Sequence, residues 1–273
     1  MKLICKNHVL DLTQPVVMGI VNVTPDSFSD GGKFFARDQA VEHARRMLDE
    51  GAAIIDIGGE STRPGAISAT LQEELDRVMP VLEILVRDGV LVSVDTQKTE
   101  VMREAIRLGA AMINDVNALQ ALGAIEVCAA ANVAVCLMHK QGAPETMQQS
   151  PHYQDVVAEV SDFLQARARA CEAAGIARER IVIDPGFGFG KTVEHNFTLL
   201  RRIGNLSALG YPVLAGFSRK SSLGSITGRE VDDRLAASLA AALIAAQNGA
   251  RVLRVHDVKE TIDVLKIWHA SHN

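Results

Sequence analysis

Short aliphatic runs recur along the whole chain, and this repetition limits the possible folds more than any other feature of the sequence. Between Val21 and Val255 they recur on average about every 33 residues, the length of one strand–helix unit. Runs without clean polar–apolar alternation are typical of strands buried on both faces of a parallel sheet. The runs are Val16–Val21, Ala53–Ile57, Leu91–Val94, Ala111–Ile113, Ala134–Leu137, Ile181–Ile183, Pro212–Leu214 and Val252–Val255.

Segments with helical patterns fill the intervals between these runs. They are Asp38–Glu50, Gln72–Arg87, Thr99–Leu108, Ala121–Ala131, Asp155–Ala174, Glu194–Arg202, Asp233–Asn248 and Val258–Ala270. Glycines stand where a left-handed residue ends a helix, at Gly51, Gly109, Gly175 and Gly249.

Eight strands that alternate with eight helices predict an α/β fold, the (β/α)8 TIM barrel. We expect residues 1–273 to form a single domain, because no linker or low-complexity segment divides the chain. Leu3–Cys5 and His8–Leu10 are expected to form a short N-terminal hairpin at the bottom of the barrel. An open, doubly wound sheet is the alternative architecture.

Composition excludes several classes of protein. With 48% hydrophobic residues the chain is too apolar to be disordered, and its net charge of −5 argues against a nucleic-acid-binding protein. No secretory leader and no apolar segment of about 20 residues is evident, so we expect a cytoplasmic protein without a membrane partner. The four cysteines lack CxxC spacing, which favours buried free thiols over a zinc or redox site.

Polar residues cluster where the predicted strands end. In a TIM barrel the carboxyl ends of the strands converge on one mouth, where active sites lie. Arg254 and His256 are two residues apart on one strand and therefore share a face. We therefore expect one polar site formed by several strand ends, among them Asn22, Asp95, Asn114, His139, Asp184, Arg254 and His256.

Seven motifs of the chain, in order along its whole length, resemble those of the dihydropteroate synthases. They are Asn22–Gly32, Asp56–Gly65, Ser93–Thr96, Ile113–Asp115, Asp184–Lys191, Gly216–Ser221 and Arg254–Asp257. Lys140 and the pair Asn117–Ala118 depart from the family pattern without touching an assigned residue. The resemblance implies that the chain joins 6-hydroxymethyl-7,8-dihydropterin diphosphate to p-aminobenzoate, with release of pyrophosphate.

The resemblance also implies how the pterin is bound. A pterin presents an amino group and a ring N–H side by side, a pattern that suits a carboxylate accepting two hydrogen bonds. The resemblance assigns that carboxylate to Asp184, with Asn114, Asp95 and Lys220 at the remaining ring edge. A turn cap beside Pro185 is the alternative role for Asp184.

For the diphosphate, Arg254 and His256 can clamp the oxygens, and Thr62 and Arg63 are expected to help. Asn22 resembles the family's protein ligand for a Mg²⁺ that bridges the diphosphate. In the expected mechanism the C–O bond breaks early and leaves a pterin-stabilised methylene cation. Catalysis is then assigned to Asp95, which favours the cation, together with the three cationic or hydrogen-bonding groups Lys220, Arg254 and His256.

For p-aminobenzoate, Ser221 and nearby Arg219 can meet the carboxylate, while Phe189, Phe28 and Pro64 can form apolar walls. Sulfonamides are expected to compete with this substrate.

The family resemblance also implies a homodimer.

Two other functions remain open at this point, and one motif is misleading. A methyltetrahydrofolate-binding barrel of a methyltransferase needs no diphosphate clamp, and a catalytically silent barrel should lack some of the site residues. The string Gly186–Thr192 resembles a phosphate-binding P-loop, but Pro185 occupies the place of its first glycine. We therefore expect a loop that enters the next helix, with Lys191 near the mouth.

Overall fold

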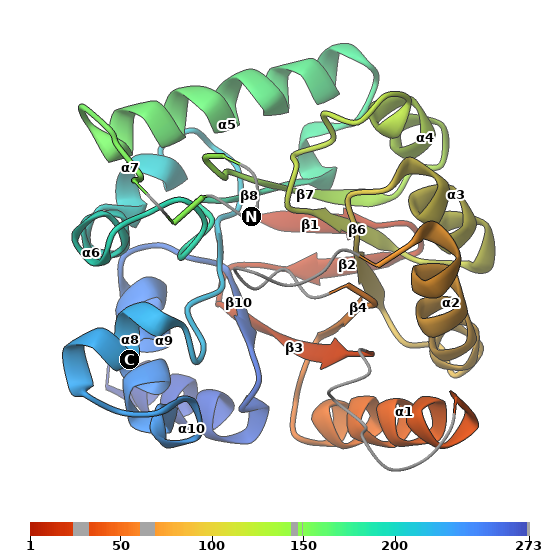
Figure 1. Ribbon diagram of the computed structural model, residues 1–273, viewed down its shortest axis with the longest axis horizontal. Helices are drawn as coiled ribbons and strands as arrows, with labels where there is room; N and C mark the ends of the chain where they lie inside the picture. Colours follow the sequence, from red (N-terminus) through yellow and green to blue (C-terminus); the bar gives the residue numbers. More distant parts are fainter. Residues whose placement is uncertain (24–32, 61–68, 143–146, 149, 272–273) are drawn as a thin grey trace.

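The computed structural model describes residues 1–23, 33–60, 69–142, 147–148 and 150–271. Parallel strands form a barrel with helices on its outside, which confirms the predicted (β/α)8 TIM-barrel fold (Figure 1). The strand order is β8-β7-β6-β5-β4-β3-β10-β9. A parallel bridge between Ile183 and Val213 joins the two ends of this order, and the Ile183 N–H donates to the carbonyl of Pro212 at 3.0 Å.

Every predicted aliphatic run overlaps a barrel strand. The strands are β3 (Val16–Asn22), β4 (Ile54–Gly58), β5 (Val92–Asp95), β6 (Met112–Asp115), β7 (Ala134–Met138), β8 (Ile181–Asp184), β9 (Leu214–Ala215) and β10 (Val252–Val255). The predicted strand Pro212–Leu214 differs from β9. Proline has no N–H to donate to the ladder, so regular pairing starts only at Leu214.

The helices follow the predicted pattern with few differences. They are α1 (Lys33–Asp49), α2 (Leu71–Arg87), α3 (Thr99–Leu108), α4 (Ala124–Ala130), α5 (Val156–Ala173), α6 (Val193–Arg201), α7 (Ile203–Ser207), α8 (Ser221–Thr227), α9 (Leu235–Gln247) and α10 (Val258–Ala270), with 3-10 turns at Arg178–Arg180 and Val231–Asp233. The glycines predicted to end helices all have positive φ, for example +113° at Gly109.

Two differences from the predicted helices have local causes. Helix α4 begins at Ala124 instead of Ala121, because the left-handed Gly123 precedes it. Helix α8 was not predicted, since its sequence SSLGSIT is short and contains one glycine, three serines and one threonine, all of them weak helix formers. This helix follows Lys220 directly, so it bears on the site described below.

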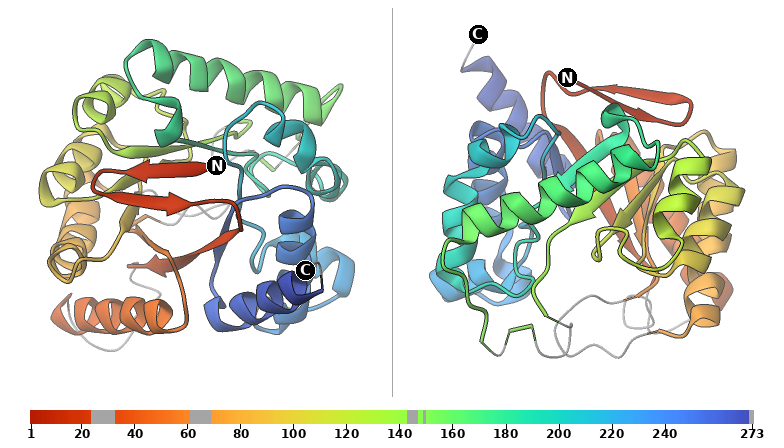
Figure 2. Two further views of the ribbon diagram at one scale, coloured as in Figure 1. Left: turned by 180° about the vertical axis from the view of Figure 1, so that it is seen from behind. Right: turned by 90° about the horizontal axis from the view of Figure 1, so that it is seen from above.

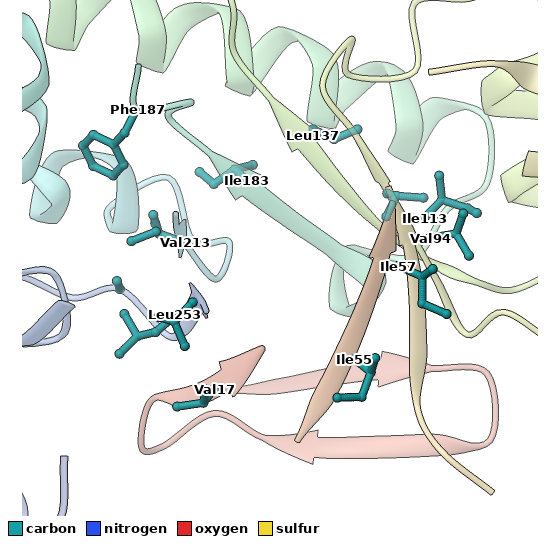
Figure 3. Close-up of a cluster of buried hydrophobic side chains, with 14 of the residues drawn as sticks. Val17, Ile55, Ile57, Val94, Ile113, Leu137, Ile183, Phe187, Val213 and Leu253 are labelled. Atoms are coloured by element: carbon teal, nitrogen blue, oxygen red, sulfur yellow. The ribbon is translucent and has the colours of Figure 1, made fainter. Parts of the chain in front are cut away.

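The outward face of the strands packs against the helices. Val17, Ile55, Val94, Ile113 and Leu253 belong to one large buried cluster that also contains residues of the helices (Figure 3). Each of these residues alternates along its strand with a neighbour that points into the barrel, because successive side chains of a strand point to opposite faces. The helices therefore cover one face of the sheet, and the barrel interior contains the other.

At the amino ends of the strands the barrel interior is apolar, and the N-terminal hairpin covers it. Strands β1 (Lys2–Cys5) and β2 (His8–Asp11) pair antiparallel and lie across one end of the barrel (Figure 2). Leu3 and Cys5 of the hairpin belong to a buried cluster with inward residues such as Met18 and Met112. The predicted hairpin at the barrel bottom is therefore confirmed.

The four cysteines are buried and free, as expected. Burial raises the pKa of the Cys5 and Cys128 thiols to about 12, so they stay protonated and unreactive near neutral pH. Among the described residues, no helix combines the length and the apolar character that a membrane crossing requires.

The hairpin gives a matched test of this packing. Leu3 is fully buried, whereas Val9 on the same hairpin is 60% exposed. Leu3→Ala leaves a cavity and is expected to lower the free energy of unfolding by about 2–5 kcal/mol. Val9→Ala should change it by no more than about 0.5 kcal/mol. Urea denaturation measures both, and equal effects would contradict the hairpin's role as a plug.

Candidate active site at the carboxyl ends of the strands

The barrel interior changes from apolar to polar along each strand. On β4 the inward side chains are Ile54 and then Asp56, and on β10 they are Val252 and then Arg254. On β8 the corresponding pair is Val182 and then Asp184. Because two residues separate successive inward positions, the same strands supply the apolar floor and the polar groups above it.

Arg254 lies at the centre of this polar layer. Its Nε donates to Asp56 Oδ2 at 2.6 Å, and its Nη2 donates to Asp95 Oδ2 at 2.8 Å. Asp56 Oδ2 also accepts a hydrogen bond from Asn114 Nδ2 at 3.1 Å. One guanidinium therefore joins β4, β5 and β10 across the interior, and Asn114 adds β6 to the network.

Asp56 was not assigned a role from the sequence. It lies inside the run Ala53–Ile57, which was read as a buried strand, and its side chain is fully buried. Its Oδ1 is a buried oxygen without a hydrogen-bond partner among the described residues. The available signal was a carboxylate in an otherwise aliphatic strand, which requires a cationic partner.

Charge and burial compete in this network. Burial raises the pKa of Asp95, the Arg254 guanidinium opposes that rise, and the neighbouring Asp56 carboxylate adds to it. Burial would lower the pKa of Arg254, but its two carboxylate partners outweigh burial and raise it. Arg254 therefore stays charged, and its charge is already shared between two carboxylates.

Asp184 ends β8 and is buried. Its Oδ1 accepts the N–H of Gly186 at 2.7 Å, so the carboxylate does cap the turn after Pro185, the alternative role considered above. Burial raises the pKa of Asp184 to about 6, while the Gly186 hydrogen bond and the charge of Lys220 oppose the rise. The cap uses one carboxylate oxygen, so capping and ligand binding are compatible.

His256 follows β10 beside Arg254. Its Nδ1 lies 3.0 Å from Ser218 Oγ. Burial, with Arg254 next in importance, lowers the pKa of His256 to about 3. The imidazole is therefore neutral near pH 7, so it offers a hydrogen bond and not the positive charge that a cationic clamp would need.

Lys220 and Arg219 lie after β9, just before α8. The Lys220 ammonium lies 4.3 Å from the centre of the Phe189 ring, a cation–π contact. Arg219 has a left-handed φ of 57°, and its Nη2 lies 2.5 Å from Asp257 Oδ1. Arg219 was expected to meet a substrate carboxylate, but the structure gives it a carboxylate partner within the chain. Ser221 is exposed at the start of α8.

Asn22 ends β3 next to Asp95. A Cβ on Gly58 would lie 3.8 Å from Asn22 Oδ1 and 3.9 Å from Asp95 Oδ2, so both oxygens border one small volume. Among the described residues no group of three or more His, Cys, Asp or Glu side chains could hold a metal on its own. Phe28, Thr62, Arg63 and Pro64 lie outside the described residues.

Comparison with known proteins identifies the class. Residues 18–256 match the family of pterin binding enzymes, so the chain belongs to this family. It is 52% identical to the dihydropteroate synthase of Haemophilus influenzae, with all of both chains covered.

Two solved structures have the same overall fold. The dihydropteroate synthase of Xanthomonas albilineans with 4-aminobenzoic acid superimposes with a TM-score of 0.94 at 53% identity, covering 99% of this chain and 98% of that chain. The dihydropteroate synthase of Yersinia pestis with a sulfonamide drug also gives 0.94, at 49% identity, covering 100% and 99%. Within the family, the chain is thus similar over its whole length to dihydropteroate synthases.

Removing the central cation tests the polar layer. Arg254→Met leaves Asp56 and Asp95 buried without a cation, and we expect it to lower the free energy of unfolding at pH 8 by about 3–5 kcal/mol. Burial raises the pKa of Asp95 and Arg254 opposes that rise, so without Arg254 this carboxyl binds its proton more tightly in the folded state. The loss should therefore shrink as the pH falls from 8 to 5, which urea denaturation at several pH values measures.

Arg45→Met is the matched control, because Arg45 pairs with Asp88 at 2.6 Å on the surface, where the two side chains are 55% and 31% exposed. We expect this variant to lose no more than about 1 kcal/mol at either pH. A loss that is the same at pH 5 and pH 8 for Arg254→Met would contradict the shared ion pair.

Proposed function

We propose that the chain condenses 6-hydroxymethyl-7,8-dihydropterin diphosphate with p-aminobenzoate to give 7,8-dihydropteroate and pyrophosphate. The observation that carries the proposal is the polar layer at the strand ends, where Asp95, Asn114 and Asp184 occur together with Lys220. Such a set of acceptors and donors fits the edge of a flat heterocycle that has both kinds of group. The similarity to dihydropteroate synthases over the whole chain supports the same assignment.

Three of these polar residues are proposed to bind the pterin ring directly. The Asp184 carboxylate accepts hydrogen bonds from the pterin amino group and the adjacent ring N–H. Asn114 is held by Asp56, so its amide has a fixed orientation toward the ring. Lys220 donates to a ring acceptor from its position over Phe189. These contacts hold Asn114 and Lys220 in place before the pterin enters, which reduces the entropy cost of binding.

The diphosphate is proposed to lie above Arg254 and His256. Arg254 Nη1 makes neither of the two ion-pair hydrogen bonds described above, and the neutral His256 donates a hydrogen bond to an oxygen. Thr62 and Arg63 are proposed to add donors. Asn22 fits a Mg²⁺ site in which one amide oxygen suffices, because magnesium keeps waters and takes substrate oxygens. When bound, Mg²⁺ would neutralise charge on the diphosphate.

The chain's own residues favour loss of the diphosphate. The C–O bond breaks first, its electron pair leaves with the diphosphate, and positive charge develops on the pterin methylene group. Asp95 stabilises that charge, while Arg254 holds its carboxylate in place at 2.8 Å. The aniline nitrogen of p-aminobenzoate then forms the new C–N bond and loses a proton.

We propose that p-aminobenzoate lies against Phe189, with Phe28 and Pro64 as further apolar walls, and that Ser221 meets its carboxylate. Ser221 is exposed at the start of α8, so its hydroxyl is accessible. Arg219 does not bind this carboxylate directly in the proposed site, because Asp257 already binds its guanidinium. A sulfonamide has a similar flat, anionic shape and is expected to take this place.

We further propose that residues 1–273 act as one domain, as a homodimer in the cytoplasm. Leu235 and Ile244 of the alanine-rich helix α9 are 39% and 40% exposed, which supports a second copy of the chain as the partner for this helix.

Pyrophosphate release tests the proposed reaction directly. The purified protein is expected to release pyrophosphate only when pterin diphosphate, p-aminobenzoate and Mg²⁺ are all present, and EDTA should abolish release. A sulfonamide should raise the KM for p-aminobenzoate without lowering kcat. Release that does not depend on the aniline would overturn the reaction, and noncompetitive inhibition would overturn the pocket at Phe189.

Two asparagine variants separate binding from catalysis. Asp184→Asn removes the acceptor of two hydrogen bonds and should weaken pterin binding about 100-fold in calorimetry, at about 1.5 kcal/mol per lost bond. Asp95→Asn should lower kcat about 100-fold, as for other electrostatic groups, and should weaken pterin binding much less than Asp184→Asn does. Full turnover by Asp95→Asn with unchanged binding would contradict the role of Asp95.

The pH dependence provides the control for these variants. The pKa of Asp184 is about 6, so pterin affinity of the parent enzyme should fall as the pH drops below 6 and the carboxyl takes up a proton. Asp184→Asn should lose that part of the pH dependence, whereas Asp95→Asn should retain it.

A further inference from the structure

Lys191 is the lysine of the P-loop-like string, and the structure buries its ammonium among acceptors of the chain itself. It is only 3% exposed. Its Nζ lies 3.0 Å from His139 Nδ1, 3.3 Å from the His139 carbonyl oxygen and 3.0 Å from the Phe189 carbonyl oxygen. An ammonium has three N–H donors, so three acceptors within the chain account for all of them.

These three acceptors belong to two different strand ends. His139 follows β7, and Phe189 lies in the loop after β8, which we call the 185–190 loop. Because an ammonium can only donate, Nδ1 of His139 is the acceptor. Burial lowers the pKa of His139 to about 3, with the charge of Lys191 next in importance, so the imidazole keeps that role. Lys191 therefore ties the 185–190 loop to the end of β7.

In the part of the chain that the structure describes, no carboxylate contacts the Lys191 ammonium. No ion pair of Lys191 is found among the described residues, where carboxylates lie within 4.0 Å of several other lysines and arginines. Burial lowers the pKa of Lys191 to about 7, and the more distant Asp184 opposes the fall. A buried cation held by two carbonyls and an imidazole is costly, so its place in the structure requires a reason.

The 185–190 loop is otherwise held by close packing and by side chains. A Cβ on Gly186 would lie 2.0 Å from the His139 carbonyl oxygen, so this glycine is needed for the close approach to β7. Tyr153 donates its hydroxyl to the Gly190 carbonyl at 2.8 Å, and the Gly188 N–H donates to Asn196 Oδ1 at 2.7 Å. Within this loop, Lys191 binds the carbonyl oxygen of Phe189. Lys191 therefore fixes the backbone of the residue whose ring contacts Lys220.

We propose that Lys191 is a positioning residue. By binding the Phe189 carbonyl it holds the Phe189 ring in its place beside the Lys220 ammonium, and this ring forms one wall of the p-aminobenzoate site. The geometry that supports this is the chain of contacts from His139 through the Lys191 ammonium to the Phe189 carbonyl, and from the Phe189 ring to Lys220 at 4.3 Å. Lys191 itself touches no substrate. The inference rests on the proposed function, because that function places p-aminobenzoate against Phe189.

Lys191→Met tests the inference, because methionine keeps most of the side-chain volume and removes all three donors. We expect the KM for p-aminobenzoate to rise about tenfold or more, since small displacements of a binding wall reduce productive alignment. Calorimetric pterin affinity should stay within about threefold of the parent, because Asp184, Asn114 and Asp95 are untouched. A merely structural role would lower the melting temperature without this split between the two substrates.

Lys191→Arg covers the case in which the methionine variant fails to fold. Arginine keeps the charge and the donors, but its longer planar group cannot place them on the same three acceptors, so the Phe189 carbonyl must move. We again expect a raised KM for p-aminobenzoate. Lys266→Met is the matched control, because it removes an ammonium that is 71% exposed on α10, and both constants should match the parent.

A parental KM for p-aminobenzoate in either folded Lys191 variant would overturn the inference. Loss of pterin affinity greater than the loss of p-aminobenzoate affinity would overturn it too. These outcomes presuppose a parent enzyme that releases pyrophosphate from the two substrates. A parent without that activity would instead contradict the proposed function, so the two failures can be told apart.

Discussion

The two ion pairs of Arg254 are the interaction on which the polar half of the barrel depends. The Asp56 side chain is fully buried and that of Asp95 is 12% exposed, so each carboxylate needs a cation in contact to compensate for its lost hydration. Arg254 supplies that cation from β10, which β3 separates from β4 in the strand order. Because Asp56 also holds Asn114, the guanidinium fixes the orientation of groups on three other strands.

This arrangement is possible because each strand supplies an apolar residue to the core near its start and a polar residue to the site near its end. The first inward residues, such as Ile54, Val182 and Val252, pack with Leu3 of the hairpin into an apolar floor. The next inward residues are polar and face the mouth. The floor excludes water from below, which strengthens every electrostatic contact in the layer above it. The hairpin therefore contributes to the site although it lies at the other end of the barrel.

The periodic runs were sufficient to predict the barrel, because buried parallel strands and C-terminal glycines such as Gly109 leave a clear pattern. The motifs were sufficient to predict that Asp95, Asn114, Asp184 and Lys220 lie at the same end of the barrel. The pairings could not be predicted. Asp56 looked like part of an aliphatic strand, and the contacts of Arg254 with it span 198 residues of sequence. The burial that makes His256 neutral is likewise a property of the packed structure.

The formal charge of the central network bears on the proposed reaction. Asp56 and Asp95 carry two negative charges against the one of Arg254, so the ionised network has a net charge of −1. Such a network does little for the anionic diphosphate in the ground state, but it favours the positive charge that develops on the pterin as the C–O bond breaks. An interaction that is stronger in the transition state than in the bound substrate raises kcat. The pairing of Arg254 with two carboxylates therefore favours the developing cation, while Arg254 Nη1 and His256 are proposed to bind the diphosphate as hydrogen-bond donors.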